Sequence, residues 1–69
     1  MLAAMSPASD AADLSSLART AETLLARVTA HTDNYARSDR SDVYGCLHDA
    51  ERTLRASVRS IEQAIKLLS

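Results

Sequence analysis

Two stripes of apolar residues run along this sequence at helical spacings of three and four positions, which is typical of amphipathic α-helices. The first stripe, widened by Ala18 and Leu25, consists of Leu14, Leu17, Ala21, Leu24, Val28, His31 and Tyr35. The second stripe, widened by Val58 and Ile65, consists of Val43, Leu47, Ala50, Leu54, Ser57, Ile61, Ala64 and Leu68. Each stripe predicts one long helix.

The two stripes are out of phase with each other. Extending the first stripe by sevens reaches Asp42, Asp49 and Ala56. The large residues Leu47 and Leu54 of the second stripe stand two positions before Asp49 and Ala56. Two residues correspond to about 200° around an α-helix, so one straight helix would carry its apolar halves on nearly opposite sides. A turn between the stripes is therefore the better interpretation.

The sequence predicts an all-α fold in which two long amphipathic helices form an antiparallel hairpin. Residues 1–69 make a single domain, with the first helix at about 7–36, a turn at about 37–41 and the second helix at about 42–68. Ser6-Pro7 is a favourable helix start, with the serine capping and the proline in the first turn. The candidate N-caps of the second helix are Ser38, Asp39 and Ser41.

A chain of this size is expected to need support beyond its own core. It has no Phe or Trp, and its single cysteine cannot form an intrachain disulfide. Small domains of this kind depend on a disulfide, a metal or a partner chain. Each stripe is also wider than a two-helix contact requires, so we expect two hairpins to dimerise into a four-helix bundle. The expected oligomer seam alternates large and small residues: Leu47, Ala50, Leu54, Ser57, Ile61, Ala64 and Leu68.

The charge balance points to no particular class of ligand. The net charge of −1 gives no overall field for nucleic acid or an anionic membrane. The opening segment MLAAMSPAS has no basic start and no apolar run long enough for a signal peptide. We therefore expect a cytoplasmic protein that does not act at a membrane.

Candidate catalytic and metal-binding residues are few. Cys46 and His48 stand two positions apart, and on a helix they point about 200° apart, so they cannot bind one ion. Asp42, Cys46 and Asp49 share a face but form no familiar metal site. No nucleophile elbow, phosphate-binding loop or paired-carboxylate pattern is present. We expect no enzyme activity, no cofactor and no metal.

The turn region is the first candidate partner-binding site. Tyr35, Arg37, Arg40 and Tyr44 gather both aromatic residues and two arginines within ten positions. Tyrosine and arginine are frequent binding anchors because they bury a large area and keep a polar end. In the alternative interpretation, the tyrosines close the end of the core and the arginines are merely solvated.

The outer face of the second helix is the second candidate. Arg52, Arg59 and Lys66 recur every seven residues and, with Arg55, could follow the phosphates of a nucleic acid. Glu51 and Glu62 flank this line, and they are spaced to form i,i+4 ion pairs with Arg55 and Lys66. A mixed charged face of this kind is usually only solvated.

Two local resemblances extend the hypotheses. The segment DVYGCLHDAERTL, residues 42–54, is similar to the second helix of the Rop family of plasmid copy-number regulators, which implies a dimeric hairpin that binds RNA. The aromatic and amide-bearing face of that family's first helix has no counterpart at Ala12, Ser16 and Thr20. The segment YARSD, residues 35–39, resembles the Tyr-x-x-x-Asp secretion signal of type VII substrates, although there a complete hairpin precedes the signal.

The sequence therefore favours one function over two others. The leading hypothesis is a non-enzymatic hairpin that self-associates and contacts another protein as a regulator or adaptor. The alternatives are a Rop-like RNA-binding hairpin dimer and a small partner of a type VII secretion system.

Overall fold

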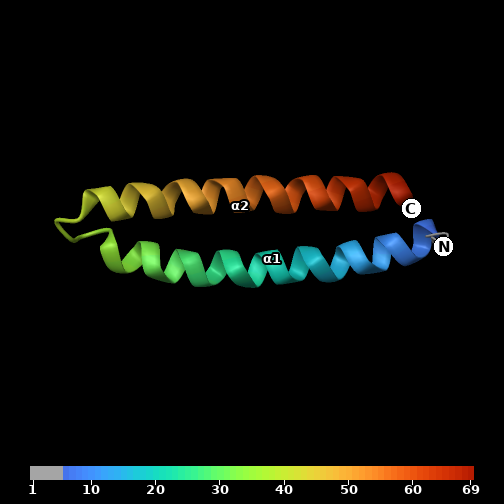
Figure 1. Ribbon diagram of the computed structural model, residues 1–69, viewed down its shortest axis with the longest axis horizontal. Helices are drawn as coiled ribbons and strands as arrows, with labels where there is room; N and C mark the ends of the chain where they lie inside the picture. The colour runs from blue at the N-terminus through green and yellow to red at the C-terminus, as the bar shows by residue number, and fades with distance from the viewer. Residues whose placement is uncertain (1–5) are drawn as a thin grey trace, which may run out of the picture.

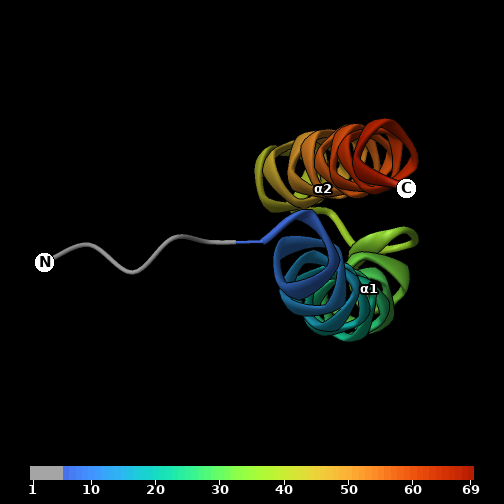
Figure 2. The ribbon, with the colours of Figure 1, turned by 90° about the vertical axis from the view of Figure 1, so that its right-hand side faces the viewer.

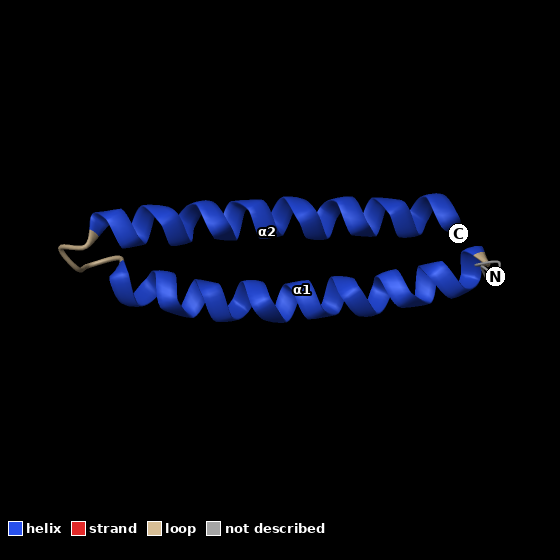
Figure 3. Ribbon diagram, viewed as in Figure 1, coloured by secondary structure: helices blue, strands red, loops and turns tan. Residues whose placement is uncertain are grey.

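The computed structural model describes residues 6–69 and shows two long helices lying side by side in opposite directions (Figures 1 and 3). Helix α1 runs over Pro7–Tyr35 and helix α2 over Ser41–Leu68. Residues 36–40 connect them in a short loop, and no residue from 6 to 69 is in a strand. The predicted all-α helical hairpin is confirmed. The first five residues of the segment MLAAMSPAS lie outside the described range.

The start of α1 follows from its first residues. Ser6 is the N-cap, and its hydroxyl accepts a hydrogen bond from the Ser9 N–H at 3.0 Å. Pro7 stands at the first helical position, where its missing N–H removes no helical hydrogen bond. Asp10 adds a carboxylate to the first turn, where the helix dipole favours negative charge. The predicted Ser-Pro helix start is confirmed.

The start of α2 is built differently from the prediction. Arg40 occupies the N-cap position and makes no side-chain capping hydrogen bond, so none of the three proposed caps is the N-cap. Ser38 instead ties the loop together, because its hydroxyl donates to the Tyr35 carbonyl at 2.9 Å and accepts from the Arg40 N–H at 3.1 Å. Ser38 thus braces the turn from inside the loop, while Ser41 is already helical.

The seam between the helices is centred on four buried residues: Ala18 and Thr32 of α1, and Glu51 and Val58 of α2. In each helix the buried residues are separated by whole heptads, as a long antiparallel contact requires. The sequence interpretation put Ala18 and Val58 only at the edges of the stripes and Glu51 on an outer face, and it was wrong in both respects. The buried residues of α1, Ala18 and Thr32, have small side chains that let the two helices approach closely. The larger side chains Leu17 and Leu24 lie outside this contact.

The view along the helices (Figure 2) shows α1 and α2 as two neighbouring cylinders, and within residues 6–69 no third element covers them. Each helix therefore has one strip against its neighbour and the rest of its surface open. Neither α1 nor α2 contains a stretch long and apolar enough to cross a bilayer.

Candidate partner-binding surfaces

The two apolar stripes lie on the same side of the hairpin. Leu14 and Leu17 come four residues and one residue before the buried Ala18 of α1, and Leu24 repeats the position of Leu17 one heptad later. Leu47 and Leu54 come four residues before the buried Glu51 and Val58 of α2. In both helices, these leucines are therefore rotated away from the seam in the same sense along the chain. Because the helices are right-handed and antiparallel, both sets turn toward one broad side. We call this side the apolar face, and it comprises the fifteen residues of the two stripes: Leu14, Leu17, Ala21, Leu24, Val28, His31 and Tyr35 of α1, and Val43, Leu47, Ala50, Leu54, Ser57, Ile61, Ala64 and Leu68 of α2.

Much of the apolar face remains open to solvent. Leu17 and Leu24 are 49% and 48% exposed, and His31 and Tyr35 are exposed as well. On α2 the expected oligomer-seam residues are half-buried except for Ser57, which is exposed. Leu17 and Leu24 are the exposed aliphatic side chains of the face, and exposed apolar side chains grouped on one surface are typical of interaction sites.

The fifteen residues of the apolar face include no Asp, Glu, Lys or Arg, although a quarter of the chain is charged. Asp10, seven residues before Leu17, continues the same line in the first turn of α1. The opposite side of the hairpin is polar and includes Ser15, Glu22, Thr29, His48, Arg55 and Glu62. Each helix is about 42 Å long and about 10 Å wide, so the two helices side by side present a face about 20 Å wide, with an area of about 800 Å². That is the area each partner buries in a protein–protein interface of standard size.

A depression lies on the side of α1 that faces away from α2, next to Leu24 of the apolar face. Its lining residues stand at positions i, i+3, i+4 and i+7: Thr20, Thr23, Leu24 and Arg27. Four residues with this spacing form the hole that receives a side chain from a facing helix in knobs-into-holes packing. The lining is mostly apolar.

The seam contains a buried carboxylate. Glu51 is 6% exposed, and it accepts a hydrogen bond from the Arg55 guanidinium at 3.2 Å. Hydrogen bonding from the Thr32 hydroxyl is the main reason that the pKa of Glu51 lies below its usual value; Thr29 and Arg55 lower it further, while burial opposes them. The Thr32 hydroxyl donates a hydrogen bond to the Val28 carbonyl of its own helix at 2.9 Å, and it lies close to the Glu51 carboxylate across the seam.

Glu51 therefore joins the two helices near the loop end of the hairpin. The i,i+4 spacing of Glu51 and Arg55 predicted their ion pair correctly. The links from Glu51 to Thr32 and Thr29 were missed, because the spacing within one helix does not show which residues of another helix lie opposite.

The predicted tip residues all lie at the loop end, but two of them are engaged with neighbours on α2. The Arg40 guanidinium holds both carboxylate oxygens of Asp42, at 3.0 and 3.1 Å, and it lowers the pKa of Asp42. Tyr44 is half-buried and packs against His48, with ring centroids 5.9 Å apart. Tyr35, at the end of α1, and Arg37, in the loop, are exposed.

The predicted basic line is partly neutralised. Arg52 pairs with Asp49 at 3.2 Å, and Arg55 pairs with the buried Glu51. Arg59 and Lys66 are exposed on the outer side of α2 and form no ion pair within residues 6–69. Two exposed cations on one helix give a weak field for following phosphates.

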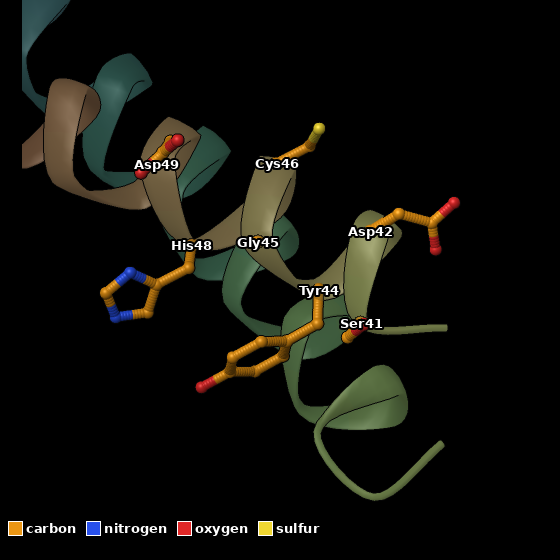
Figure 4. A pocket seen from close by; sticks show the side chains of 7 residues that line it. All are labelled: Ser41, Asp42, Tyr44, Gly45, Cys46, His48 and Asp49. Carbon is orange, nitrogen blue, oxygen red and sulfur yellow. The ribbon is translucent and has the colours of Figure 1, made fainter. Parts of the chain in front are cut away.

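A shallow open groove lies at the start of α2 (Figure 4), lined by Ser41, Asp42, Tyr44, Gly45, Cys46, His48 and Asp49. Cys46 and His48 point to different sides of the helix, as their spacing predicts. Across residues 6–69, no three His, Cys, Asp or Glu side chains lie close enough together to hold a metal ion. The groove is thus a bend of the surface rather than an enclosed pocket.

No family model matches the chain, and no match was found among curated proteins or solved structures.

Proposed function

We propose that this protein is a non-enzymatic helical hairpin that self-associates into a four-helix bundle and acts through protein–protein contacts as a regulator or adaptor. One observation carries the proposal. The apolar face presents fifteen residues without a single charged side chain, while the opposite side of the same hairpin is polar. A second copy of the chain is the occupant that fits best, since its own apolar face needs the same cover and has the same length.

The composition of α2 supports close packing between hairpins. Ala50, Ser57 and Ala64 recur every seven residues beside the larger residues Leu54 and Ile61. Where two such helices run antiparallel, large side chains of one can face small side chains of the other. This arrangement lets helices approach closely without leaving cavities.

Melting experiments at different protein concentrations test the proposal. An oligomer that buries the apolar face should melt at a higher temperature as the concentration rises. Leu24→Glu places a charge in the middle of the apolar face and should abolish this dependence. Ala26→Glu adds the same charge on the opposite side of α1 and serves as the matched control. A melting temperature that does not change with concentration in the wild type would contradict the proposal.

The nucleic-acid alternative ranks second. The exposed Arg59 and Lys66 favour it, whereas the ion pairs of Arg52 and Arg55 with carboxylates weaken it. Its signature is an affinity that falls steeply with salt, because phosphate contacts release counterions. The secretion-partner alternative rests on Tyr35 and Asp39, which lie at the end of α1 and in the loop, before the second helix begins.

A further inference from the structure

The outer stripes of α1 have a symmetric arrangement of residue types. One stripe, spaced by sevens, reads Asp10, Leu17, Leu24 and His31, and the neighbouring stripe reads Asp13, Thr20 and Arg27. The first stripe is centred between Thr20 and Ala21, and the second is centred on Thr20, half a position away. In an antiparallel pair of α1 helices related by a two-fold axis at that centre, Leu17 of each copy would lie opposite Leu24 of the other. Toward the ends, the acidic residues Asp10 and Asp13 of one copy would lie opposite the basic residues His31 and Arg27 of the other.

The depression on α1 has the right position for such a pairing. The centre of its four lining residues lies about three positions after Thr20 in the sequence, and Leu17 lies three positions before Thr20. The depression and Leu17 are therefore about equally far from the proposed centre. In an antiparallel pair centred there, Leu17 of each copy reaches the hole formed by Thr20, Thr23, Leu24 and Arg27 of the other. Leu17 is 49% exposed in the single hairpin, so it is available as the inserted side chain.

The charges at the edge of the apolar face agree with the same pairing. Asp13 and Arg27 are both exposed, and neither forms an ion pair within the described residues 6–69. In the antiparallel pair, Asp13 of one copy lies beside Arg27 of the other, twice in each dimer. In a parallel pair, Asp13 would face Asp13 and Arg27 would face Arg27, and like charges repel.

We infer that two copies associate through α1 in antiparallel orientation, about a two-fold axis at Thr20 and Ala21, with Leu17 of each copy seated in the hole of Thr20, Thr23, Leu24 and Arg27 of the other. This inference rests on the proposed self-association and specifies its orientation. The two-fold axis is perpendicular to the helices, so it reverses their direction. The loops of the two copies therefore lie at opposite ends of the bundle. The dimer would then present two separate copies of the Tyr35–Tyr44 tip.

Charge reversal tests the orientation, with the dimer dissociation constant measured by sedimentation equilibrium. Asp13→Arg and Arg27→Asp should each weaken the homodimer by roughly tenfold, because each creates two like-charge contacts. The double variant carrying both substitutions should restore the affinity to within about twofold of wild type, since each contact is again between opposite charges. Arg19→Asp and Asp33→Arg, which make the same charge changes on the other side of α1, should alter the affinity little. Circular dichroism of each variant checks that the helices are intact.

Three other outcomes overturn the inference, and they are distinguishable. In a parallel dimer, the single variants would bind as tightly as wild type, and an equimolar mixture of the two would bind more tightly. If α1 does not form the contact, all variants including the controls would behave alike while the wild type still dimerises. A wild type that stays monomeric at every concentration would contradict the proposed function itself.

Discussion

Glu51 of α2 and Thr32 of α1 are both buried at the centre of the hairpin seam, where the carboxylate of one helix meets the hydroxyl of the other. The pair lies across the seam near the loop end of the hairpin. A one-turn slip would separate the pair and leave the carboxylate buried beside apolar side chains, which is costly. Glu51 thus contributes to the register of the hairpin, whereas the leucines contribute area.

The pair predicts how stability depends on pH. The pKa of Glu51 is lowered in the folded hairpin, so the folded state favours the ionised carboxylate. Its contribution is fully present above the ordinary value of 4.5 and is lost as the pH falls below it, through the lower folded value. Urea unfolding between pH 7 and pH 3 should therefore show a loss of stability on acidification that is smaller in Glu51→Gln.

Thr32→Val provides the matched control for this effect. It keeps the shape of the side chain but removes the main hydrogen-bond donor to Glu51. The acid-induced loss of stability should then be smaller and be complete at a higher pH, because the folded pKa of Glu51 moves back toward its ordinary value. An unchanged pH profile in both variants would show that the pair does not act as described.

A second prediction concerns the close approach of the helices at Ala18. Ala18 is 6% exposed at the seam, so Ala18→Leu should force the helices apart and destabilise the protein by about 1–3 kcal/mol. Ala26→Leu makes the same change on the exposed side of α1 and should alter the free energy of unfolding by less than about 0.5 kcal/mol. Equal effects in urea unfolding would mean that Ala18 does not lie at the seam.

A third prediction concerns the loop. Ser38→Ala removes the hydroxyl that joins the Tyr35 carbonyl to the Arg40 N–H, and should cost about 1 kcal/mol of stability. Ser41→Ala should cost less, because Ser41 is not the N-cap of α2. Thermal melting compares the two variants, and a larger loss for Ser41→Ala would restore the capping role that its sequence position suggested.

A fourth prediction separates the two candidate partner surfaces. Tyr44→Ala combined with Arg40→Ala alters the tip, and alanine at Arg52, Arg59 and Lys66 alters the basic line. If the tip binds the partner, the tip variant should remain folded and oligomeric but lose its native partner in a pull-down from the host. Loss of the partner in the basic-line variant alone would place the interaction along α2 instead.

The sequence predicted the hairpin because its two stripes each follow a helical period and stand out of phase across the loop. It predicted the two helices and the loop better than it predicted which residues form the seam. Ala18, Thr32 and Glu51 are small or polar, so no hydrophobic pattern marks them as central. Their burial is decided by the neighbouring helix, and a single helix's spacing contains no information about that neighbour.

The candidate sites show the same division. The ion pair of Glu51 with Arg55 follows from i,i+4 spacing, and the divergence of Cys46 and His48 follows from helix geometry. The pairing of Arg40 with Asp42 lies where the loop joins α2, and no periodic pattern covers that junction. The depression on α1 could have been predicted, because a hole at i, i+3, i+4 and i+7 is a property of sequence spacing.

Sedimentation equilibrium of the unmodified protein over the micromolar range tests whether a second copy covers the apolar face. We expect a mass of two chains at the upper end of the range and dissociation on dilution, with helicity falling as the hairpins separate. Leu24→Glu should remain monomeric under the same conditions, and Ala26→Glu should dimerise like the wild type. A wild-type protein that sediments as one chain and stays fully helical at every concentration would contradict the claim that the apolar face is covered by a second copy.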